Sequence, residues 1–222
     1  MSVALAETAA WLDLLYSRAK KDAGKVVVIS ASKRNVIGTF ATDGDSLVRC
    51  ASLMQENEGC YVKVNLMDTD AMARRGSHVV GNRSEVKTIV SFHCDVDAGK
   101  GGKYPARGTA LWAINQMPLV PTLIINSNGN VGGFHAYWVL KQPYTITDED
   151  DRKRVQDISK GWQGLLRQKL AGMLDNTSNL DRVLRCVNVK RCDGGDVTAH
   201  TYNVECEYSM EDFEKWLISE EH

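Results

Sequence analysis

Residues 86–96 place the strongest constraint on the fold of this chain. Their β-branched and aromatic side chains predict a long strand, and Asp95 and Asp97 stand at its carboxyl end, ahead of the glycine-rich basic stretch 99–103. Side chains alternate along a strand, so both carboxylates lie on one face. Two neighbouring anions repel unless a cation lies between them, which predicts a site for Mg²⁺ or Mn²⁺; a pair of solvated loop aspartates is the alternative.

The remaining chain alternates between helical and strand patterns. Apolar residues at helical spacing predict helices over residues 4–20, 43–57, 104–117, 147–174 and 210–218. Alternating or β-branched stretches predict further strands over 25–29, 60–67, 121–126, 134–140 and 198–205, with an irregular connection over 68–85. Because most of the strands follow one another through hairpins, the pattern predicts an α+β fold with a single mixed, mostly antiparallel sheet and flanking helices.

The sequence predicts one main domain, because no internal repeat, low-complexity tract or linker divides it. This domain spans residues 1–207 and consists of an N-terminal part, 1–84, and a core, 85–207, that carries the motifs described below. A short C-terminal helix within 208–222 could begin a linker to a further domain.

The composition, 43% hydrophobic and 25% charged, is that of a folded protein rather than a disordered or fibrous one. The longest apolar runs are too short for a membrane span, and the first residues lack a secretory signal, so we expect a cytoplasmic protein without a membrane partner. Six cysteines are scattered without a Cys-x-x-Cys pair, which favours reduced thiols over a zinc site.

A net charge of −1 argues against a nucleic-acid partner, since lysine and arginine provide most of the affinity for phosphate. The charges are segregated, however. Two groups are basic, namely Lys100, Lys103 and Arg107, and Arg182, Arg185, Lys190 and Arg191. Each basic group could contact phosphates or be an ordinary solvated face.

A second stretch that could take part in chemistry is the hairpin expected around residues 125–138. It places Ser127 before several glycines and His135 after them. The glycines let backbone N–H groups approach an anion, and the histidine can donate to a phosphate. A plain hairpin turn is the alternative.

A third stretch places Asp181 ahead of Arg185 and Lys190. The acid could complete a metal site, and the cations beside it could hold a triphosphate or a template. The same residues could also form the surface of a connection between a helix and a strand.

These stretches follow one another as strand-Asp-x-Asp, then Ser…Gly…His-x-Tyr-Trp, then Leu-Asp-Arg-Val-Leu-Arg…Asn-x-Lys. Their order and spacing resemble the archaeo-eukaryotic primase superfamily, especially the primase-polymerase domains of plasmid and viral replication proteins. The resemblance covers about residues 85–215.

The resemblance implies a role for each motif residue. The catalytic, metal-binding residues would be Asp95, Asp97 and Asp181, with Asp175 as a weaker candidate for the third place. The residues implied to bind the nucleotide are His135, Ser127, Arg185 and Lys190. Those implied to contact DNA are Lys100, Lys103, Arg182 and Arg191.

The implied activity is that of a nucleotidyltransferase, a DNA primase and polymerase. It would use Mg²⁺ or Mn²⁺ to transfer ribo- or deoxyribonucleotides from their triphosphates, making primers on a single-stranded DNA template. A plasmid or phage replication system is the implied setting, and a helicase domain or protein is a further implied partner.

Two departures from the family pattern support an alternative. The Pro-Gly-Thr turn of related domains is missing between Arg185 and Asn188, and the interval from Ser127 to His135 exceeds the compact form of the family. The alternative is a catalytically weakened module that binds nucleotide or DNA in a replication initiator or a defence protein. A metal-dependent nuclease built on the same carboxylates is a third hypothesis.

Overall fold

The computed structural model describes residues 1–76, 80–99, 102–129, 132–193 and 195–219. Its helices are α1 (Val3–Tyr16), α2 (Gly44–Glu56), α3 (Thr69–Arg75), the 3-10 turn η1 (Arg83–Glu85), α4 (Arg107–Asn115), α5 (Glu149–Lys169) and α6 (Met210–Ser219). Its strands are β1 (Val26–Ser30), β2 (Asn35–Phe40), β3 (Cys60–Lys63), β4 (Leu66–Met67), β5 (Val86–Val96), β6 (Leu123–Asn126), β7 (Phe134–Thr145), β8 (Val183–Leu184) and β9 (Thr198–Tyr202). No helix in these ranges is long and apolar enough to cross a membrane.

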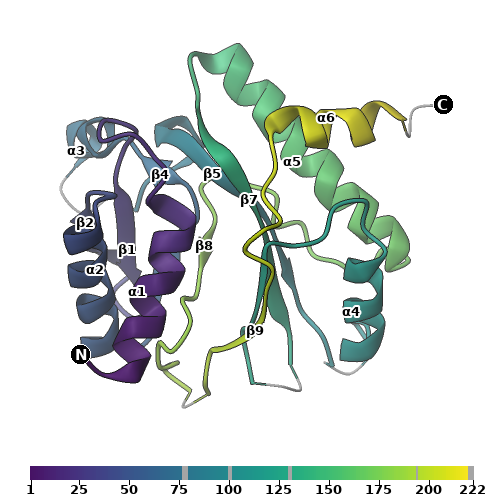
Figure 1. The fold of residues 1–222 in the computed structure, drawn as a ribbon, viewed down its shortest axis with the longest axis horizontal. Helices are drawn as coiled ribbons and strands as arrows, with labels where there is room; N and C mark the ends of the chain where they lie inside the picture. The colour runs from purple at the N-terminus through teal and green to yellow at the C-terminus, as the bar shows by residue number, and fades with distance from the viewer. Residues whose placement is uncertain (77–79, 100–101, 130–131, 194, 220–222) are drawn as a thin grey trace.

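The strands form two antiparallel sheets, one in the order β2-β1-β3-β8 and the other in the order β4-β5-β7-β6-β9. Figure 1 shows α1 and α2 with the first sheet and α4, α5 and α6 with the second. The predicted α+β class with antiparallel strands and flanking helices is confirmed, but the strands are divided between two sheets instead of one. A bridge between Lys25 and Met67 joins them.

The division occurs at Asn65, inside the strand predicted over residues 60–67. The chain leaves the first sheet after β3 and enters the second as β4. Between them the buried Asn65 accepts from the backbone N–H of Val90 at 3.0 Å and donates to the carbonyl of Leu180 at 3.0 Å. The pairing of β5 with β7 shifts register between Ile89 and Ser91, and the Val90 amide lies at this irregularity. The Asn65 side chain therefore provides that amide with a partner and links β5 to the segment around Leu180.

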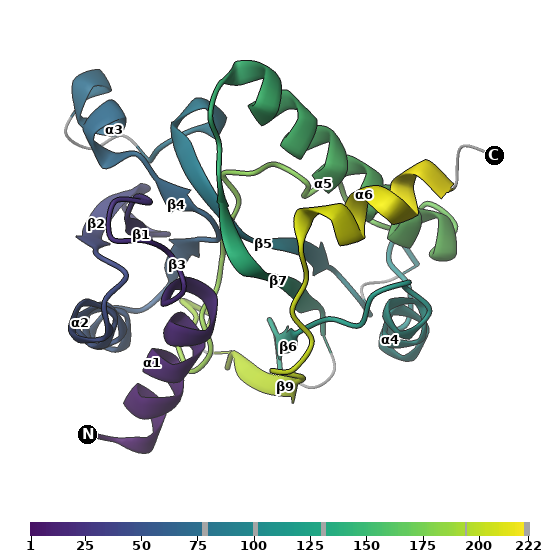
Figure 2. The same cartoon turned by 45° about the horizontal axis from the view of Figure 1, so that its top comes forward.

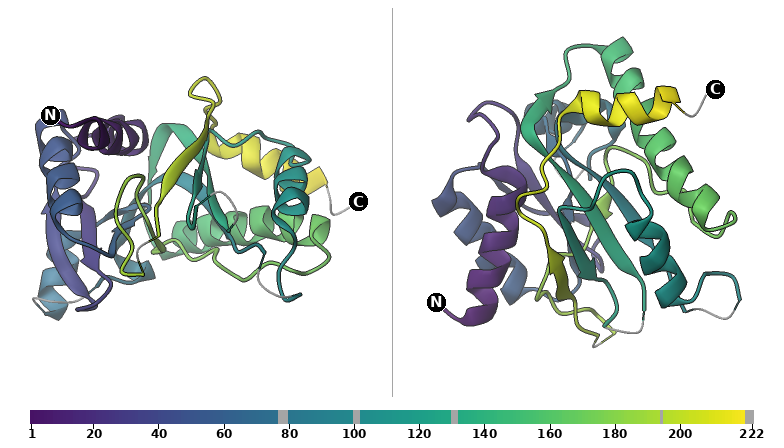
Figure 3. Two further views of the ribbon diagram at one scale, coloured as in Figure 1. Left: turned by 90° about the horizontal axis from the view of Figure 1, so that it is seen from below. Right: turned by 45° about the vertical axis from the view of Figure 1, so that its right-hand side comes forward.

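The five-stranded sheet is covered on both faces (Figures 2 and 3). On one face Trp138 of β7 packs edge-on against Trp162 of α5, with ring centroids 5.4 Å apart, and Trp162 contacts Phe213 of α6 at 5.0 Å. On the other face the preceding residue, Tyr137, contacts Trp11 of α1 at 5.9 Å. Neighbouring strand residues point in opposite directions, so each face of the sheet buries its own core.

Most predicted elements are confirmed within a few residues at their ends. The long helix begins at Glu149 rather than at Thr147, and its N-cap is Asp148, whose carboxylate accepts from the backbone N–H of Asp151. Two strands and an α-helix were not predicted. They are the strands β2 and β8, and the helix α3 inside the connection over 68–85. Asp68 caps α3 by accepting from the Ala71 amide.

We predict that Asn65→Ala lowers the free energy of unfolding by roughly 2 to 4 kcal/mol, because it leaves the Val90 amide and the Leu180 carbonyl buried without partners. Urea denaturation followed by circular dichroism measures the change. Asn57→Ala serves as the control, since its exposed amide donates only to Leu53 at the end of α2, and it should cost less than about 1 kcal/mol. Equal losses for the two variants would contradict the role given to Asn65.

Candidate active site

The pairing of β5 with β7 brings the first two sequence motifs together. Asp95 lies directly opposite His135 in the register of the two strands. Directly opposed residues on one face of an antiparallel pair have side chains in contact. The Nε2 atom of His135 accordingly lies 3.5 Å from Oδ1 of Asp95, and Asp97 follows just beyond the end of β5.

Gly133 lets the hairpin turn approach the aspartates. A Cβ atom at this position would overlap the carbonyl oxygen of Val96 and lie 3.1 Å from the Cα atom of Asp97. The Ser127 amide donates to the Gly133 carbonyl at 3.0 Å, which closes the hairpin at its base. Gly133 therefore allows close packing between two backbones. This role differs from the approach to an anion that was predicted for the glycines of the turn.

A pocket of about 670 Å³ opens at this point between the two sheets. Its lining residues from β5, the β6–β7 hairpin and β7 are Asp95, Asp97, Ser127, Asn128, Gly133 and His135. Those from β3, β8 and their surroundings are Tyr61, Arg182, Val183, Leu184, Arg185, Arg191 and Asp193. All three sequence motifs therefore contribute to one concave site.

Asp95 has a charged or polar neighbour at each of its two carboxylate oxygens. Arg182 donates from Nη2 to its Oδ2 atom at 2.7 Å, while His135 faces its Oδ1 atom. Burial works to raise the pKa of Asp95, but the neighbouring His135 and Arg182 outweigh it and hold the pKa below its ordinary value. Asp95 is therefore ionised at neutral pH.

The two histidines beside Asp95 are neutral at the same pH. Burial lowers the pKa of His135 to about 4, although Asp95 acts in the opposite direction. Burial also lowers the pKa of His93 to about 4, and the positive charge of Arg182 adds to this effect. Neutral His135 keeps one ring N–H that could donate to a ligand oxygen.

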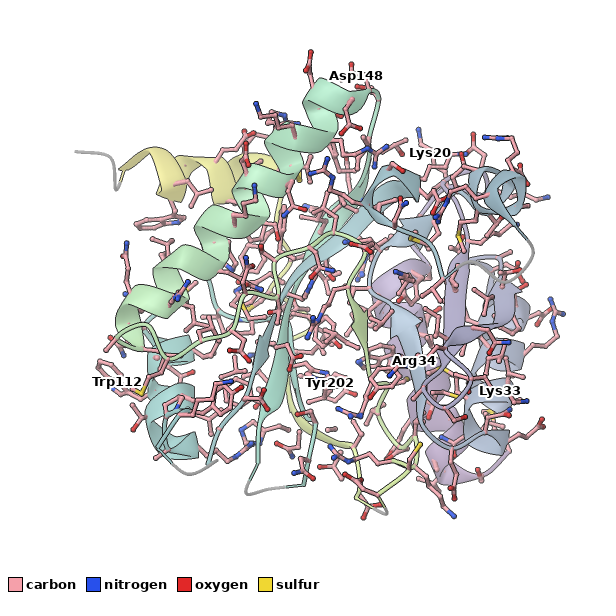
Figure 4. All side chains as sticks on the ribbon, turned by 180° about the vertical axis from the view of Figure 1, so that it is seen from behind. Lys20, Lys33, Arg34, Trp112, Asp148 and Tyr202 are labelled. Carbon is pink, nitrogen blue, oxygen red and sulfur yellow. The ribbon has the colours of Figure 1, made fainter. Side chains whose placement is uncertain are left out.

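Thr177 lies between α5 and β8 and links this segment to β5, the strand that carries Asp95. Its hydroxyl accepts from the Asp95 amide at 3.3 Å and from the Gln163 side chain of α5 at 2.7 Å. Its carbonyl accepts from His93 Nε2 at 3.1 Å, and its amide donates to Gln163 at 3.0 Å. Figure 4 shows α5 running across this sheet from its start at Asp148. The buried network fixes the segment that leads to Arg182.

The other two arginines of the pocket form hydrogen bonds between the segments that line it. Arg185 donates to the Tyr61 hydroxyl at 2.8 Å, and its guanidinium carbon lies 4.9 Å from the centre of that ring. Arg191 donates to the Ser127 carbonyl at 2.6 Å and pairs with Asp193. Arg185 links the third motif to the N-terminal sheet, and Arg191 links it to the hairpin. Both guanidiniums line the pocket together with its carboxylates.

Other residues predicted from the sequence lie outside the pocket lining. The carboxylate of Asp181 is 3.5 Å from the buried Nζ of Lys63 and accepts from Asn179 at 3.2 Å. Lys190 is exposed. The hydroxyl of Tyr104 donates to Asp175 at 2.7 Å and accepts from Lys103 at 2.7 Å. Lys100 lies outside the described residues.

The missing Pro-Gly-Thr turn is replaced by another turn. Residues 187 and 188 turn the chain, with Asn188 in the left-handed region at φ 59°. Asparagine tolerates this conformation better than most residues. The Asn188 amide donates to the Val197 carbonyl at 2.8 Å, and Gln55 of α2 donates to the Asn188 carbonyl at 2.9 Å. The N-terminal helices thus support the third motif.

The donor set fits a divalent ion that arrives with a phosphate ligand. Two carboxylates, Asp95 and Asp97, line the pocket, and Mg²⁺ is commonly held by one or two carboxylates together with substrate phosphates. Within the part of the chain that the structure describes, no group of three or more His, Cys, Asp or Glu side chains is arranged to hold a metal by itself. Among the same residues, buried His135 Nδ1 and Arg182 Nε have no hydrogen-bond partner.

Some contributors to the site carried no signal in the sequence. Tyr61 comes from the N-terminal sheet and reaches the pocket only because β3 pairs with β8. Thr177 and Gln163 act through contacts between segments that no local pattern connects. A sequence motif can reveal residues that lie close together on one helix or strand. The places of Tyr61, Thr177 and Gln163 depend instead on how elements distant in sequence pack together.

Comparisons with known proteins identify the fold. No protein-family model matches the sequence, and no curated protein matches it. Among solved structures, the chain is similar to the archaeo-eukaryotic primase domain of the cyanophage S-2L primase-polymerase, with a TM-score of 0.58 and 15% sequence identity over 96% of this chain and 97% of that one. It is also similar to the catalytic domain of primase RepB′ in complex with initiator DNA, with a TM-score of 0.53 and 8% identity over 96% of this chain and 95% of that one.

Both similarities extend over nearly the full length of both chains. The resemblance predicted from the motifs is therefore confirmed at the level of the fold: this chain has the fold of archaeo-eukaryotic primase catalytic domains, including the N-terminal part that the motifs did not cover.

We predict that Gly133→Ala separates the hairpin from the aspartates. The new methyl group would meet backbone atoms, which cannot move aside as a side chain can, so the free energy of unfolding should fall by roughly 1 to 3 kcal/mol. Gly164→Ala is the matched control, because its Cβ would have nothing within 4 Å and it lies inside α5. That variant should gain roughly 0.5 to 1 kcal/mol. Thermal unfolding of both variants measures the difference, and a neutral Gly133→Ala would refute the close approach.

We also predict that the free energy of unfolding of the metal-free protein falls as the pH is lowered, before most carboxylates are protonated. The pKa of His93 and of His135 falls from the ordinary 6.5 to about 4 in the folded chain, so below pH 6.5 the unfolded chain binds protons that the folded chain does not. Stability is complete above about pH 6.5 and falls towards pH 4, by about 3 kcal/mol for each histidine.

Urea titrations in EDTA between pH 7 and pH 5 test this dependence. His93→Gln should reduce the slope, whereas His200→Gln, at an exposed position, should change it much less. A free energy of unfolding that stays constant from pH 7 to pH 5 would rule out neutral buried histidines at the site.

Proposed function

We propose that this chain is the catalytic domain of a DNA primase-polymerase, which transfers nucleotides from their triphosphates onto a growing strand paired with single-stranded DNA. The observation that carries the proposal is the convergence of Asp95, Asp97, His135 and a set of arginines in one pocket. Carboxylates for a divalent ion and cations for a polyphosphate are the two requirements of nucleotidyl transfer. The fold shared with the cyanophage primase-polymerase domain and the RepB′ primase supports the same function.

In this proposal the two aspartates hold Mg²⁺ or Mn²⁺. The ion would lower the pKa of the attacking 3′-hydroxyl and neutralise the leaving pyrophosphate. Asp95 is prepared for this role, because its pKa stays below the ordinary value despite burial. Asp181 remains the predicted third carboxylate, and its side chain would have to turn away from Lys63 to reach the pocket.

The chain's own donors would bind and orient the triphosphate. His135 is neutral and fixed by the strand pairing, so its ring N–H can donate to a phosphate oxygen in line with the attacking group. Ser127 and the backbone of the hairpin lie beside it. Arg185 and Arg191 would neutralise the remaining charge, with Lys190 further out.

The proposed partners are a single-stranded DNA template and nucleoside triphosphates, with a helicase domain or protein as a further one. The RepB′ structure that this chain resembles contains initiator DNA. Lys103 is exposed on the loop that follows β5, where it could contact the template, and Arg182 and Arg191 line the pocket nearer the nucleotide. Contacts to phosphate should make template binding weaken steeply as salt rises.

Two observations favour the rival hypothesis, a module that binds nucleotide or DNA without polymerising. Asp95 is paired with Arg182, and Asp181 is not in the pocket lining. The rival predicts nucleotide binding without product, whereas a nuclease would shorten the template. A gel of radiolabelled products made from template, nucleotides and Mn²⁺ separates all three functions.

We predict that Asp95→Asn and Asp97→Asn each lower the rate of primer synthesis at least about a hundredfold, because each removes a charge needed to hold the ion. Asp157→Asn is the matched control, since that exposed aspartate of α5 pairs with Lys160 away from the pocket lining, and its activity should equal that of the wild type. Circular dichroism would verify that all variants are folded. Full synthesis by either pocket variant would remove the basis of the proposed function.

A further inference from the structure

Arg182 occupies an unusual place in the pocket, because it holds one of the carboxylates expected to bind the metal. Its Nη2 atom donates to Asp95 Oδ2 at 2.7 Å, and its side chain keeps 31% of its surface exposed. Its Nε atom has no hydrogen-bond partner within the described residues. The guanidinium is therefore held by the ion pair to Asp95, while its buried Nε atom contributes no hydrogen bond that would fix it further.

We propose that Arg182 exchanges partners during the reaction cycle: it pairs with Asp95 in the free protein and with the triphosphate when nucleotide and metal bind. This inference rests on the proposed function and assigns Arg182 to the nucleotide rather than to the template. The exchange couples the binding of the two ligands through one side chain.

Both oxygens of Asp95 have neighbours in the free protein, which makes the exchange necessary. Oδ2 accepts from Arg182, and Oδ1 lies 3.5 Å from His135. A divalent cation placed on Asp95 would stand against the positive guanidinium, and like charges at such distances repel strongly where water is partly excluded. The ion can bind well only after Arg182 has moved.

A triphosphate offers Arg182 a better partner than the carboxylate. The planar guanidinium matches phosphate oxygens in a two-point geometry, and a polyphosphate carries more negative charge than one aspartate. When Arg182 turns to the phosphates, Asp95 becomes free for the ion and no charge is left unpaired. The change conserves ion pairs and so avoids a large desolvation cost.

The backbone around Arg182 is fixed, so that only the side chain needs to move. The Arg182 carbonyl accepts from the Val64 amide at 3.0 Å, and its amide donates to the Asn179 carbonyl at 3.1 Å. The next residue, Val183, pairs with Lys63 in the sheet. A long side chain on an anchored backbone can exchange between two anions about one side-chain length apart without moving the sheet.

The binding of Mn²⁺ without nucleotide, followed by electron paramagnetic resonance, tests the exchange directly. Arg182→Gln removes the competing charge, so this variant should bind Mn²⁺ about fivefold to tenfold more tightly than the wild type. Arg185→Gln is the matched control: it lines the same pocket but contacts Tyr61 instead of Asp95, and it should alter Mn²⁺ affinity less than about twofold.

A second measurement uses a non-hydrolysable nucleoside triphosphate. In the wild type this ligand should tighten Mn²⁺ binding through both its phosphates and the release of Asp95, whereas in Arg182→Gln only the phosphates contribute. The ratio of Mn²⁺ affinities with and without the analogue should therefore be about fivefold smaller in the variant. Arg182→Lys, which keeps the charge, should behave more like the wild type in both measurements.

Mn²⁺ affinity in Arg182→Gln that equals or falls below the wild-type value would overturn the proposal and make Arg182 a fixed support of Asp95. If that variant fails to fold, the wild type and Arg182→Lys still decide: exchange predicts that the analogue tightens Mn²⁺ binding in both proteins, and no tightening in either rejects it. Because these measurements need no turnover, wild-type protein that makes no primers would reject only the proposed function.

Discussion

The antiparallel pairing of β5 with β7 is the constraint on which the rest of the site depends. It sets Asp95 opposite His135, and it places Gly133 of the hairpin against the backbone at Val96 and Asp97. Helices α5 and α6 bury one face of this pair and α1 packs on the other, so the register cannot slip without exposing two cores. The geometry of the carboxylates is therefore a product of the whole sheet and not of a flexible loop.

The electrostatics of the pocket follow from balanced charges at its wall. Arg182 compensates Asp95, Arg191 compensates Asp193, and the burial of His135 keeps this residue neutral. These internal pairs balance Asp95 and Asp193 when no ligand is bound. It is also poised to bind a cation and a polyanion together, because the internal pairs can be replaced by pairs with the ligands.

The strand over residues 86–96 and the long helix after residue 147 were predictable from the sequence, because their apolar periods are strong and uninterrupted. Asp95, Asp97, Ser127 and His135 were predictable as a group because the order of the motifs identified the fold. The division into two sheets was not, since it occurs at the buried Asn65, whose hydrogen-bond partners Val90 and Leu180 are distant in sequence. Tyr61 and Thr177 were equally hidden, because their positions result from contacts between elements distant in sequence.

The most direct test of this account is a crystal structure of the protein with Mn²⁺ and a non-hydrolysable nucleoside triphosphate. The anomalous signal of manganese locates the ion independently of any assumption about its ligands. The account predicts an anomalous peak between the carboxylates of Asp95 and Asp97, with the triphosphate beside His135 and within reach of the pocket arginines. A peak elsewhere, with Asp95 still paired to Arg182 and the triphosphate outside the pocket, would contradict it.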